Sequence, residues 1–243
     1  MSSTANLLEL KGVHTHIGAY HILHGVDLAI PKGQLTMLLG RNGAGKTTTL
    51  RTIMGLWQAS QGSIHFNGRD ITRLHTPQIA ELNIAYVPEN MGIFADLTVK
   101  ENLLLAARKA SNAAQMDAAR LQWIFRLFPA VEKFWNHPAG KLSGGQKQMV
   151  AVARAIIEPR DLLIVDEPSK GLAPAIINNM IEAFDQLKKS GVTILLVEQN
   201  IYFAKRLGDT VAVMDNGRVV HAGSMAALAA DEALQQSLLG LSL

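Results

Sequence analysis

A glycine-rich loop between a short apolar run and a helix-forming segment constrains the fold of this chain most strongly. Residues 40–47 read GRNGAGKT and fit the pattern G-x-x-x-x-G-K-[ST], with an additional glycine at position 43. Glycines let the backbone curl so that successive amide N–H groups point at phosphate oxygens, and the following helix adds the positive end of its dipole. The apolar residues 35–40 predict the strand that this motif requires before it. This context favours a phosphate site over an ordinary glycine-rich turn.

The side chains of this loop have distinct expected roles. Lys46 is expected to reach the β- and γ-phosphates of a nucleotide, and Thr47 is expected to offer its hydroxyl to Mg²⁺. The predicted nucleotide contacts are Gly40, Arg41, Asn42, Gly43, Ala44, Gly45, Lys46, Thr47 and Thr48.

Short apolar runs alternate with helix-forming segments along most of the chain, which predicts a mostly parallel α/β sheet. The first residues alternate polar and apolar side chains, as antiparallel strands do. Helical spacing dominates from about Thr98 to Glu158, and the tail from Ser224 also reads as helical. The expected buried strands are residues 35–40, 84–88, 162–166, 193–197 and 210–215.

Several dipeptides predict turns and helix starts. Asn-Gly pairs at 67–68 and 216–217 predict hairpins. Thr76 followed by Pro77 predicts a helix cap with proline at the first helical position, and Pro174 predicts another helix start. The segment that begins at Lys46 predicts a helix as far as residue 57.

An acidic pair ends the apolar run LLIVDEP, residues 162–168. Asp166 is expected to hold Mg²⁺, and Glu167 is expected to polarise the water that attacks the γ-phosphate. A pair of acidic residues in a loop is common by itself. Because this acidic pair lies downstream of a phosphate-binding loop, we favour its role in metal binding and catalysis.

A second phosphate-binding helix start is predicted at LSGGQ, residues 142–146. Ser143 can act as the N-cap of the helix that follows, and the glycines expose amide groups there. A second such site is useful if it serves the nucleotide of another subunit.

These motifs, in this order, resemble those of the ABC ATPase family, and the resemblance covers essentially the whole chain. The corresponding family motifs are Walker A (40–47), the signature (142–146), Walker B with its glutamate (162–167) and the D-loop (169–174). The resemblance implies a RecA-like P-loop NTPase core of the α/β class, an antiparallel β region and an inserted helical subdomain. It implies one domain over residues 1–243, with residues 1–90 and 158–243 in the core and β region and about 91–157 in the helical subdomain.

In this family two such domains pair head to tail. Each nucleotide then lies between the Walker A of one subunit and the signature of the other. The resemblance therefore implies that the partner's nucleotide contacts Ser143, Gly144, Gly145 and Gln146.

Finer features resemble the LivF-type subunits of branched-chain amino-acid importers. They are YVPENMGIFADLTVKENL (86–103), GLAP (171–174) and LVEQN (196–200). This resemblance implies a cytoplasmic motor subunit on the inner face of the membrane that uses ATP and Mg²⁺. Its implied partners are a second ABC ATPase, two membrane-spanning permease subunits and a periplasmic substrate-binding protein. Importers of urea or amides share these features, and a lipid exporter motor is a further alternative.

Two positions depart from the usual family pattern. Glu89 stands where the family usually has a glutamine that senses Mg²⁺ and the attacking water, and Gln199 stands where it usually has a switch histidine. The carboxylate can still bind Mg²⁺, and the amide can hydrogen-bond the γ-phosphate without carrying positive charge. We therefore count Glu89 and Gln199 with Glu167 as catalytic, and Glu89 with Thr47 and Asp166 as metal ligands. The two substitutions suggest an asymmetric heterodimer whose partner carries much of the turnover.

An aromatic ring usually stacks on adenine in this family, but the aligned position here is Ile17. Tyr20 or His16 is an alternative contact. A ring–base stack contributes about 1–3 kcal/mol, so its loss predicts modest affinity for ATP and weak base selectivity.

Composition excludes several other classes. The chain has no cysteine, so it has no disulfide or thiolate metal site, and no apolar run approaches the length of a spanning helix. The N-terminus lacks the pattern of a signal peptide. The net charge is +3, but the basic residues are dispersed, and one domain without long heptads argues against a nucleic-acid ATPase. Histidines 14, 16, 21 and 24 suggest a metal cluster, although solvated surface histidines explain them better.

Overall fold

The structure, a computed structural model, describes residues 5–108, 110 and 112–240. The outermost ends of the expected domain, 1–4 and 241–243, and positions 109 and 111 lie outside the described residues.

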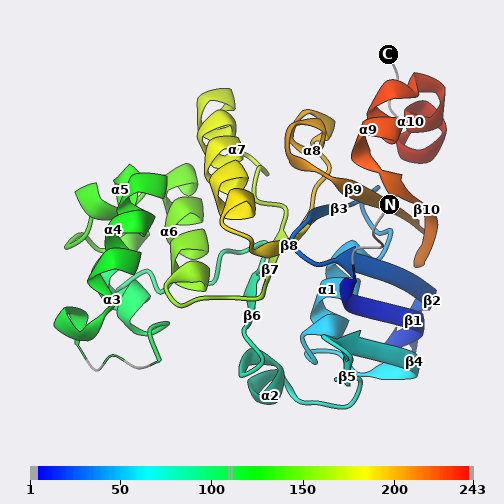
Figure 1. Cartoon of the computed structure of the whole chain (residues 1–243), viewed down its shortest axis with the longest axis horizontal. Coiled ribbons are helices and arrows are strands. Elements are labelled where there is room, and N and C mark those ends of the chain that lie inside the picture. Colours follow the sequence, from blue (N-terminus) through cyan, green and yellow to red (C-terminus); the bar gives the residue numbers. More distant parts are fainter. Residues whose placement is uncertain (1–4, 109, 111, 241–243) are drawn as a thin grey trace.

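Two sheets organise the chain (Figure 1). The larger sheet has the strand order β10-β9-β3-β8-β7-β6 and is parallel except for β10, which pairs antiparallel with β9. The smaller sheet is antiparallel, with the order β2-β1-β4-β5. The strands are β1 (Asn6–Ile17), β2 (Tyr20–Pro31), β3 (Leu35–Gly40), β4 (Ala59–Phe66), β5 (Arg69–Asp70), β6 (Ile84–Val87), β7 (Leu162–Asp166), β8 (Thr193–Val197), β9 (Thr210–Asp215) and β10 (Arg218–Ser224).

The described helices form four groups along the chain. α1 follows the glycine-rich loop, α2 lies between β5 and β6, several helices lie between β6 and β7, and the rest accompany the last strands. The helices are α1 (Lys46–Ile53), α2 (Thr76–Ala80), α3 (Val99–Leu104), η1 (Ala113–Gln115), α4 (Ala118–Leu127), α5 (Pro129–Lys133), η2 (Ala139–Lys141), α6 (Gly144–Ile156), α7 (Pro174–Lys189), α8 (Ile201–Leu207), α9 (Met225–Ala230) and α10 (Glu232–Leu239).

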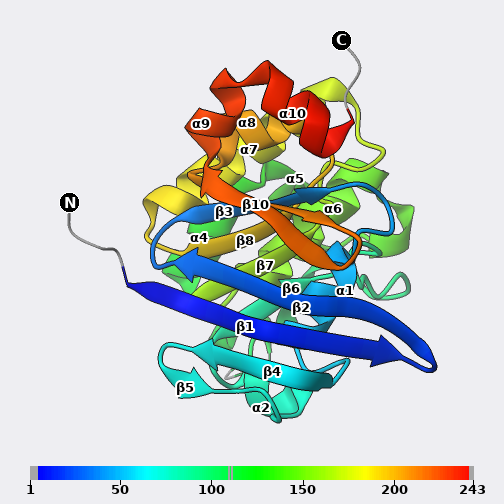
Figure 2. The same cartoon turned by 90° about the vertical axis from the view of Figure 1, so that its right-hand side faces the viewer.

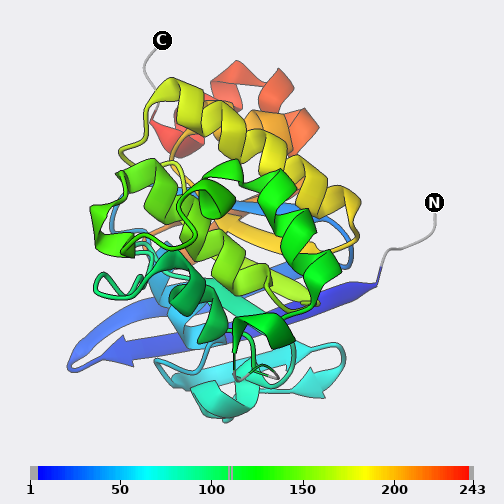
Figure 3. The same cartoon turned by 90° about the vertical axis from the view of Figure 1, so that its left-hand side faces the viewer.

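The larger sheet separates two apolar cores. Successive side chains of a strand point to opposite faces, so Leu163 and Val165 of β7 join one core and Leu162 and Ile164 join the other. The first core lies under α3–α9, which cover one face in Figure 3, and the second lies under the antiparallel sheet of Figure 2. Strands buried on both faces read as continuous apolar runs, which is why the sequence predicted them.

The expected parallel strands are confirmed, and both Asn-Gly pairs form hairpin turns with positive φ at each residue. Two helix expectations were wrong in detail. α1 ends at Ile53 because Gly55, at φ 67, closes the helix through its N–H bond to the Thr52 carbonyl. α2 begins one residue early, with His75 as N-cap, because the His75 amide donates to Gln78 Oε1 at 3.0 Å.

Every element that the structure describes between β6 and β7 is helical, from α3 to α6. Within the described residues, we find no helix with the length and apolar character that crossing a bilayer requires.

Candidate phosphate site

The glycine-rich loop runs from the end of β3 to the start of α1, as its sequence predicted. Gly40, Gly43 and Gly45 have φ values of 146, 82 and 101, which favour glycine. A Cβ on Gly40 would collide with the carbonyl oxygen of Met214 on the neighbouring strand β9. No side chain caps α1, whose N-cap is Gly45, so its first amides remain available to an anion.

Lys46 lies buried under the loop and faces the acidic strand end. Its Nζ donates to the carbonyl oxygens of Gly40, at 2.8 Å, and Arg41, at 3.1 Å. The same nitrogen lies 3.8 Å from Oε1 of Glu167. Burial lowers the pKa of Lys46, and the nearby carboxylates of Glu167 and Asp166 oppose that shift.

Asp166 ends β7 as a buried carboxyl without a hydrogen-bond partner. Its residue is 1% exposed, and neither carboxylate oxygen bonds to a described residue. Burial raises its pKa to about 6, helped by the charges of Glu167 and Glu89 and opposed by the Thr47 hydroxyl and Lys46. Two unpaired buried oxygens beside a hydroxyl are a donor set that suits Mg²⁺.

Glu167 is the first residue after β7 and has an uncommon backbone conformation, with φ 49. Its amide donates to the Val197 carbonyl of β8 at 2.9 Å, which fixes the turn. Gln199 Nε2 donates both to Glu167 Oε1 and to Asn42 Oδ1, the latter at 2.8 Å. The structure thus brings together the acidic strand end, the switch position and the glycine-rich loop.

Glu198 is a residue of this site that the motifs did not identify. It follows β8 directly, is 2% exposed, and accepts hydrogen bonds from the Ser169 amide and hydroxyl at 2.9 and 2.8 Å. The amides of Gln199 and Asn200 also donate to it, each at 3.2 Å. Burial raises the pKa of Glu198, and the Ser169 hydroxyl opposes the shift. An acidic residue immediately after a fully buried strand was the available sequence signal.

Glu89 lies in the turn after β6 and pairs with a lysine. Lys170 Nζ lies 2.5 Å from Glu89 Oε1 and 3.5 Å from Glu167 Oε2. The hydrogen bond to Glu89 raises the pKa of Lys170, and the Glu167 charge adds to this effect. Sequence reasoning identified Glu89 but not Lys170.

The glycine-rich loop, Glu89, Glu167 and Lys170 line one pocket of about 320 Å³. A pocket of about 240 Å³ adjoins the other side of the loop and includes Arg41 and Gln199. The described residues that line the larger pocket are Ile22, Asn42, Gly43, Ala44, Gly45, Lys46, Thr47, Thr48, Glu89, Glu167 and Lys170.

The signature residues lie apart from this pocket. Ser143 caps α6, since its Oγ accepts from the Gln146 amide at 3.4 Å and its amide donates to Gln146 Oε1 at 2.9 Å. None of residues 143–146 lines the phosphate pocket. α6 stands among the helices, whereas the glycine-rich loop joins β3 to α1 (Figure 1). Gly145 permits close packing, because a Cβ there would lie 2.6 Å from Cγ2 of Ile176.

The predicted adenine contact, Ile17, does not line the described phosphate pocket, whereas Ile22 does. Ile17 pairs with Tyr20 at the tip of the β1–β2 hairpin. Tyr20 is 76% exposed and His16 is also exposed.

The four histidines of the same hairpin cluster around His21, on which His14 and His16 stack, whereas the ring of His24 is tilted by 53°. The ring centroids of His16 and His21 lie 4.2 Å apart, and those of His21 and His24 lie 4.1 Å apart. His14 Nδ1 lies 3.0 Å from His21 Nε2. Across the described part of the chain, no group of three or more His, Asp or Glu residues is arranged to hold a metal ion.

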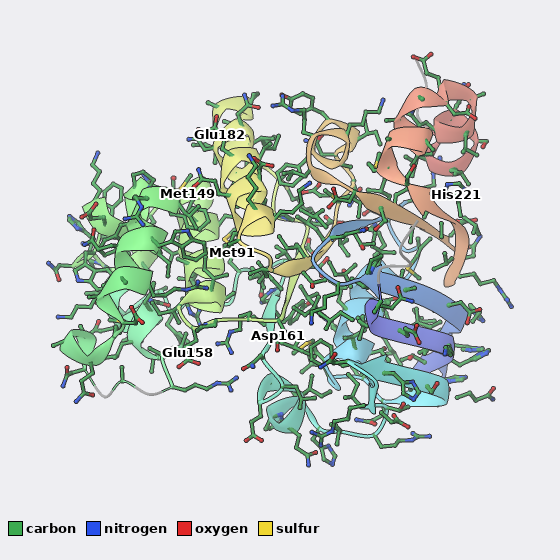
Figure 4. The ribbon with its side chains drawn as sticks, in the orientation of Figure 1. Met91, Met149, Glu158, Asp161, Glu182 and His221 are labelled. Carbon is green, nitrogen blue, oxygen red and sulfur yellow. The ribbon has the colours of Figure 1, made fainter. Side chains whose placement is uncertain are left out.

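A larger groove of about 750 Å³ opens beside the turn that carries Glu89. Its lining runs from Ile84 through Pro88 to Met91, and Met91 lies between α6 and the strands in Figure 4. Four arginines also line this mainly apolar groove: Arg51, Arg108, Arg154 and Arg160.

Comparison with known proteins agrees with this geometry. The family model described as "ABC transporter" matches residues 23–170, more than half of the chain. The chain is 39% identical over 237 residues to the high-affinity branched-chain amino acid transport ATP-binding protein BraG of Pseudomonas aeruginosa, covering 96% of this chain and 100% of that one. It is 36% identical over 225 residues to the probable branched-chain amino acid transport ATP-binding protein LivF of Archaeoglobus fulgidus, covering 91% and 93%.

A solved dimeric structure of a bacterial ABC transporter cassette superimposes with a TM-score of 0.79 at 25% identity, covering 90% of this chain and 98% of that one. Fold, motif geometry and relatives therefore agree, and this chain belongs to the ABC transporter family, whose members bind and hydrolyse ATP to drive transport.

Proposed function

We propose that this chain is the ATP-hydrolysing motor subunit of an ABC importer for branched-chain or related amino acids. The convergence of Lys46, Asp166 and Glu167 at the glycine-rich loop carries the proposal of ATP hydrolysis. The names of the relatives BraG and LivF support the substrate class.

The pocket residues divide the hydrolysis of ATP between them. The loop amides and Lys46 bind the phosphates, and Glu167 orients a water in line with the γ-phosphorus. Attack of this water forms a bond to phosphorus while the bond to the ADP oxygen breaks, and the water's proton passes to Glu167 or to a phosphate oxygen. Gln199 holds Glu167 and Asn42 in place through its amide nitrogen.

Mg²⁺ is the metal that fits the donor set of Asp166 and Thr47, with Glu89 as a third ligand. The unpaired buried oxygens of Asp166 support this assignment. When bound, Mg²⁺ would neutralise charge on the β- and γ-phosphates.

We further infer that the chain is one ABC domain, with a core in residues 1–90 and 158–243 and a helical subdomain in about 91–157. The signature, Ser143 to Gln146, would then complete the site of a second subunit, because it lies apart from this chain's own pocket. The dimeric form of the bacterial cassette supports the pairing of two such subunits.

Glu89 and Gln199 depart from the glutamine and histidine that are usual in the family. These departures support pairing with a different ATPase subunit rather than with a second copy of this chain. In such a heterodimer the partner's own Walker A site would carry much of the turnover. The test is ATP hydrolysis by the reconstituted pair carrying Glu167→Gln in this chain. If the partner's site carries out most of the hydrolysis, the rate of ATP turnover should be unchanged. Complete loss of turnover would refute the asymmetric heterodimer.

The groove of about 750 Å³ fits a segment of a permease subunit at the inner face of the membrane. It is contiguous with the Glu89 turn, so its occupant could sense the phosphate pocket. Two of the four arginines of the groove, Arg51 and Arg108, are exposed, and they favour an acidic side chain on an otherwise apolar docking segment. Cell fractionation tests the location, since we expect this chain on the cytoplasmic side of the membrane only when the permease subunits are present.

The substrate class is tested by deleting the gene for this chain and measuring uptake of labelled leucine, isoleucine, valine and urea. We expect loss of high-affinity uptake of the three amino acids, restored by the wild-type chain. Selective loss of urea uptake would refute the amino-acid assignment. It would leave the proposal of an ATP-driven importer intact.

A further inference from the structure

The loop after β7, which matches the D-loop (169–174), places a lysine in the phosphate pocket to which we have assigned no role so far. Lys170 Nζ lies 2.5 Å from Glu89 Oε1 and 3.5 Å from Glu167 Oε2, and all three residues line the pocket. Glu89 follows β6 and Glu167 follows β7, which are neighbouring strands. Lys170 therefore joins two acidic loops at the carboxyl edge of the sheet.

The charges around this pocket are unbalanced without Lys170. The charged residues among its described lining are Lys46, Glu89, Glu167 and Lys170, with the buried Asp166 directly behind. If Lys170 were neutral, three carboxyl groups would share one lysine at a place that must accept phosphate groups. Repulsion between like charges is stronger in a partly buried pocket than in water.

Lys170 contributes little to the stability of the fold. Its side chain is 58% exposed and that of Glu89 is 45% exposed, and ion pairs at such exposure stabilise proteins weakly. Glu167, by contrast, is 9% exposed and also pairs with Lys46. A substitution of Lys170 should therefore alter the charge of the pocket without unfolding the chain.

We propose that Lys170 is a positioning residue that offsets the charge of Glu89 and holds Glu89 and Glu167 where the pocket can accept nucleotide phosphates. The proposal rests on the proposed function, because it concerns the same site. It assigns Lys170 a role within its own chain, before any partner subunit binds.

The test is a double-substitution cycle that measures the binding of fluorescent ATP to the purified full chain. We expect Lys170→Met to weaken binding about threefold to tenfold, by loss of one nearby positive charge. We expect Lys170→Arg to bind as the wild type does. In the Glu89→Gln background, Lys170→Met should have a smaller effect, because only the charge of Glu167 is left for Lys170 to offset. The loss should grow in EDTA, where ATP carries more negative charge, and shrink at high salt.

Lys189 provides the matched control. It is also an exposed lysine in an ion pair, with Asp185 Oδ2 at 2.6 Å, but it lies on α7 away from the pocket lining. Lys189→Met should leave ATP binding unchanged. Equal binding by Lys170→Met and the wild type would overturn the proposal, and so would an equal loss with and without Glu89→Gln. Failure of the wild-type chain to bind ATP would instead refute the proposed function.

Discussion

Glu167 combines a disfavoured backbone conformation with several side-chain contacts. Its φ of 49 is uncommon for a residue with a Cβ, and its amide bond to Val197 and its contacts with Lys46 and Gln199 hold it there. Such residues often occur at functional sites, where the surrounding structure maintains the strain. The sequence predicted Glu167 from its place after an apolar strand, but the conformation depends on β8, which is distant in the sequence.

Asp166 should make the stability of the chain depend on pH. Its pKa in the folded chain, about 6, lies above the ordinary value of 3.8, so protonation favours the folded state and this stabilisation is lost as pH rises through about 6. Between about pH 5 and about pH 7.5, the free energy of unfolding of the wild type should fall by roughly 1 kcal/mol more than that of Asp166→Asn. Urea unfolding of both proteins without nucleotide checks this. A parallel pH dependence in both proteins would contradict it.

Glu198 should be important for stability, because its carboxylate satisfies four donors in a buried place. Glu198→Ala would leave the Ser169 hydroxyl and the neighbouring amides without their acceptor, at a cost of about 2–4 kcal/mol. Chemical denaturation measures this loss. Glu182→Ala is the control, since Glu182 is exposed on α7 (Figure 4) and should change stability by less than about 0.5 kcal/mol. Similar effects of the two substitutions would refute the role of Glu198.

At the scale of elements, local sequence patterns predicted the strands that position the site, but not the side-chain contacts between its loops. β3, β7, β8 and β9 have the predicted bounds because strands buried on both faces are apolar runs bounded by polar residues or glycine. The contacts of Lys170 and Glu198 join loops that only the tertiary fold brings together. Ile22 lines the described phosphate pocket and Ile17 does not, and the contact of Ile17 with adenine stays a prediction.

The N-cap of α6 should serve both stability and catalysis. Ser143→Ala removes the side-chain acceptor for the Gln146 amide and should cost about 1 kcal/mol of stability. It should also slow ATP hydrolysis by the assembled dimer while leaving nucleotide binding to the isolated chain unchanged. Thermal unfolding, turnover and binding measurements together check these expectations.

Ser224→Ala is the matched control, because Ser224 caps α9 in the same way, with Oγ 3.1 Å from the Ala227 amide. It should cost similar stability without slowing hydrolysis. Equal loss of turnover in both variants would mean that Ser143 acts only as a helix cap.

At the scale of the whole molecule, we propose that the chain carries half of each of two sites. Its phosphate pocket lies at the carboxyl ends of β3 and β7, and its signature begins α6 within the helical part. A groove is lined by Pro88 and Asn90, which lie on either side of Glu89 in the sequence, and we propose that a permease segment docks there. The sequence predicted the two half-sites, but not the groove, because its lining comes from segments far apart along the chain.

The most direct test of the central claim is ATP-driven uptake of labelled leucine by vesicles that contain the assembled importer. Lys46 is buried against the loop carbonyls and Glu167, so Lys46→Ala should remove phosphate binding by this chain. We expect closure of the pair to need ATP bound at both pockets, even where the partner hydrolyses most of it, so Lys46→Ala should abolish uptake. Lys189→Ala should transport at the wild-type rate. Uptake at the wild-type rate with Lys46→Ala would contradict the claim that transport requires ATP bound at this pocket.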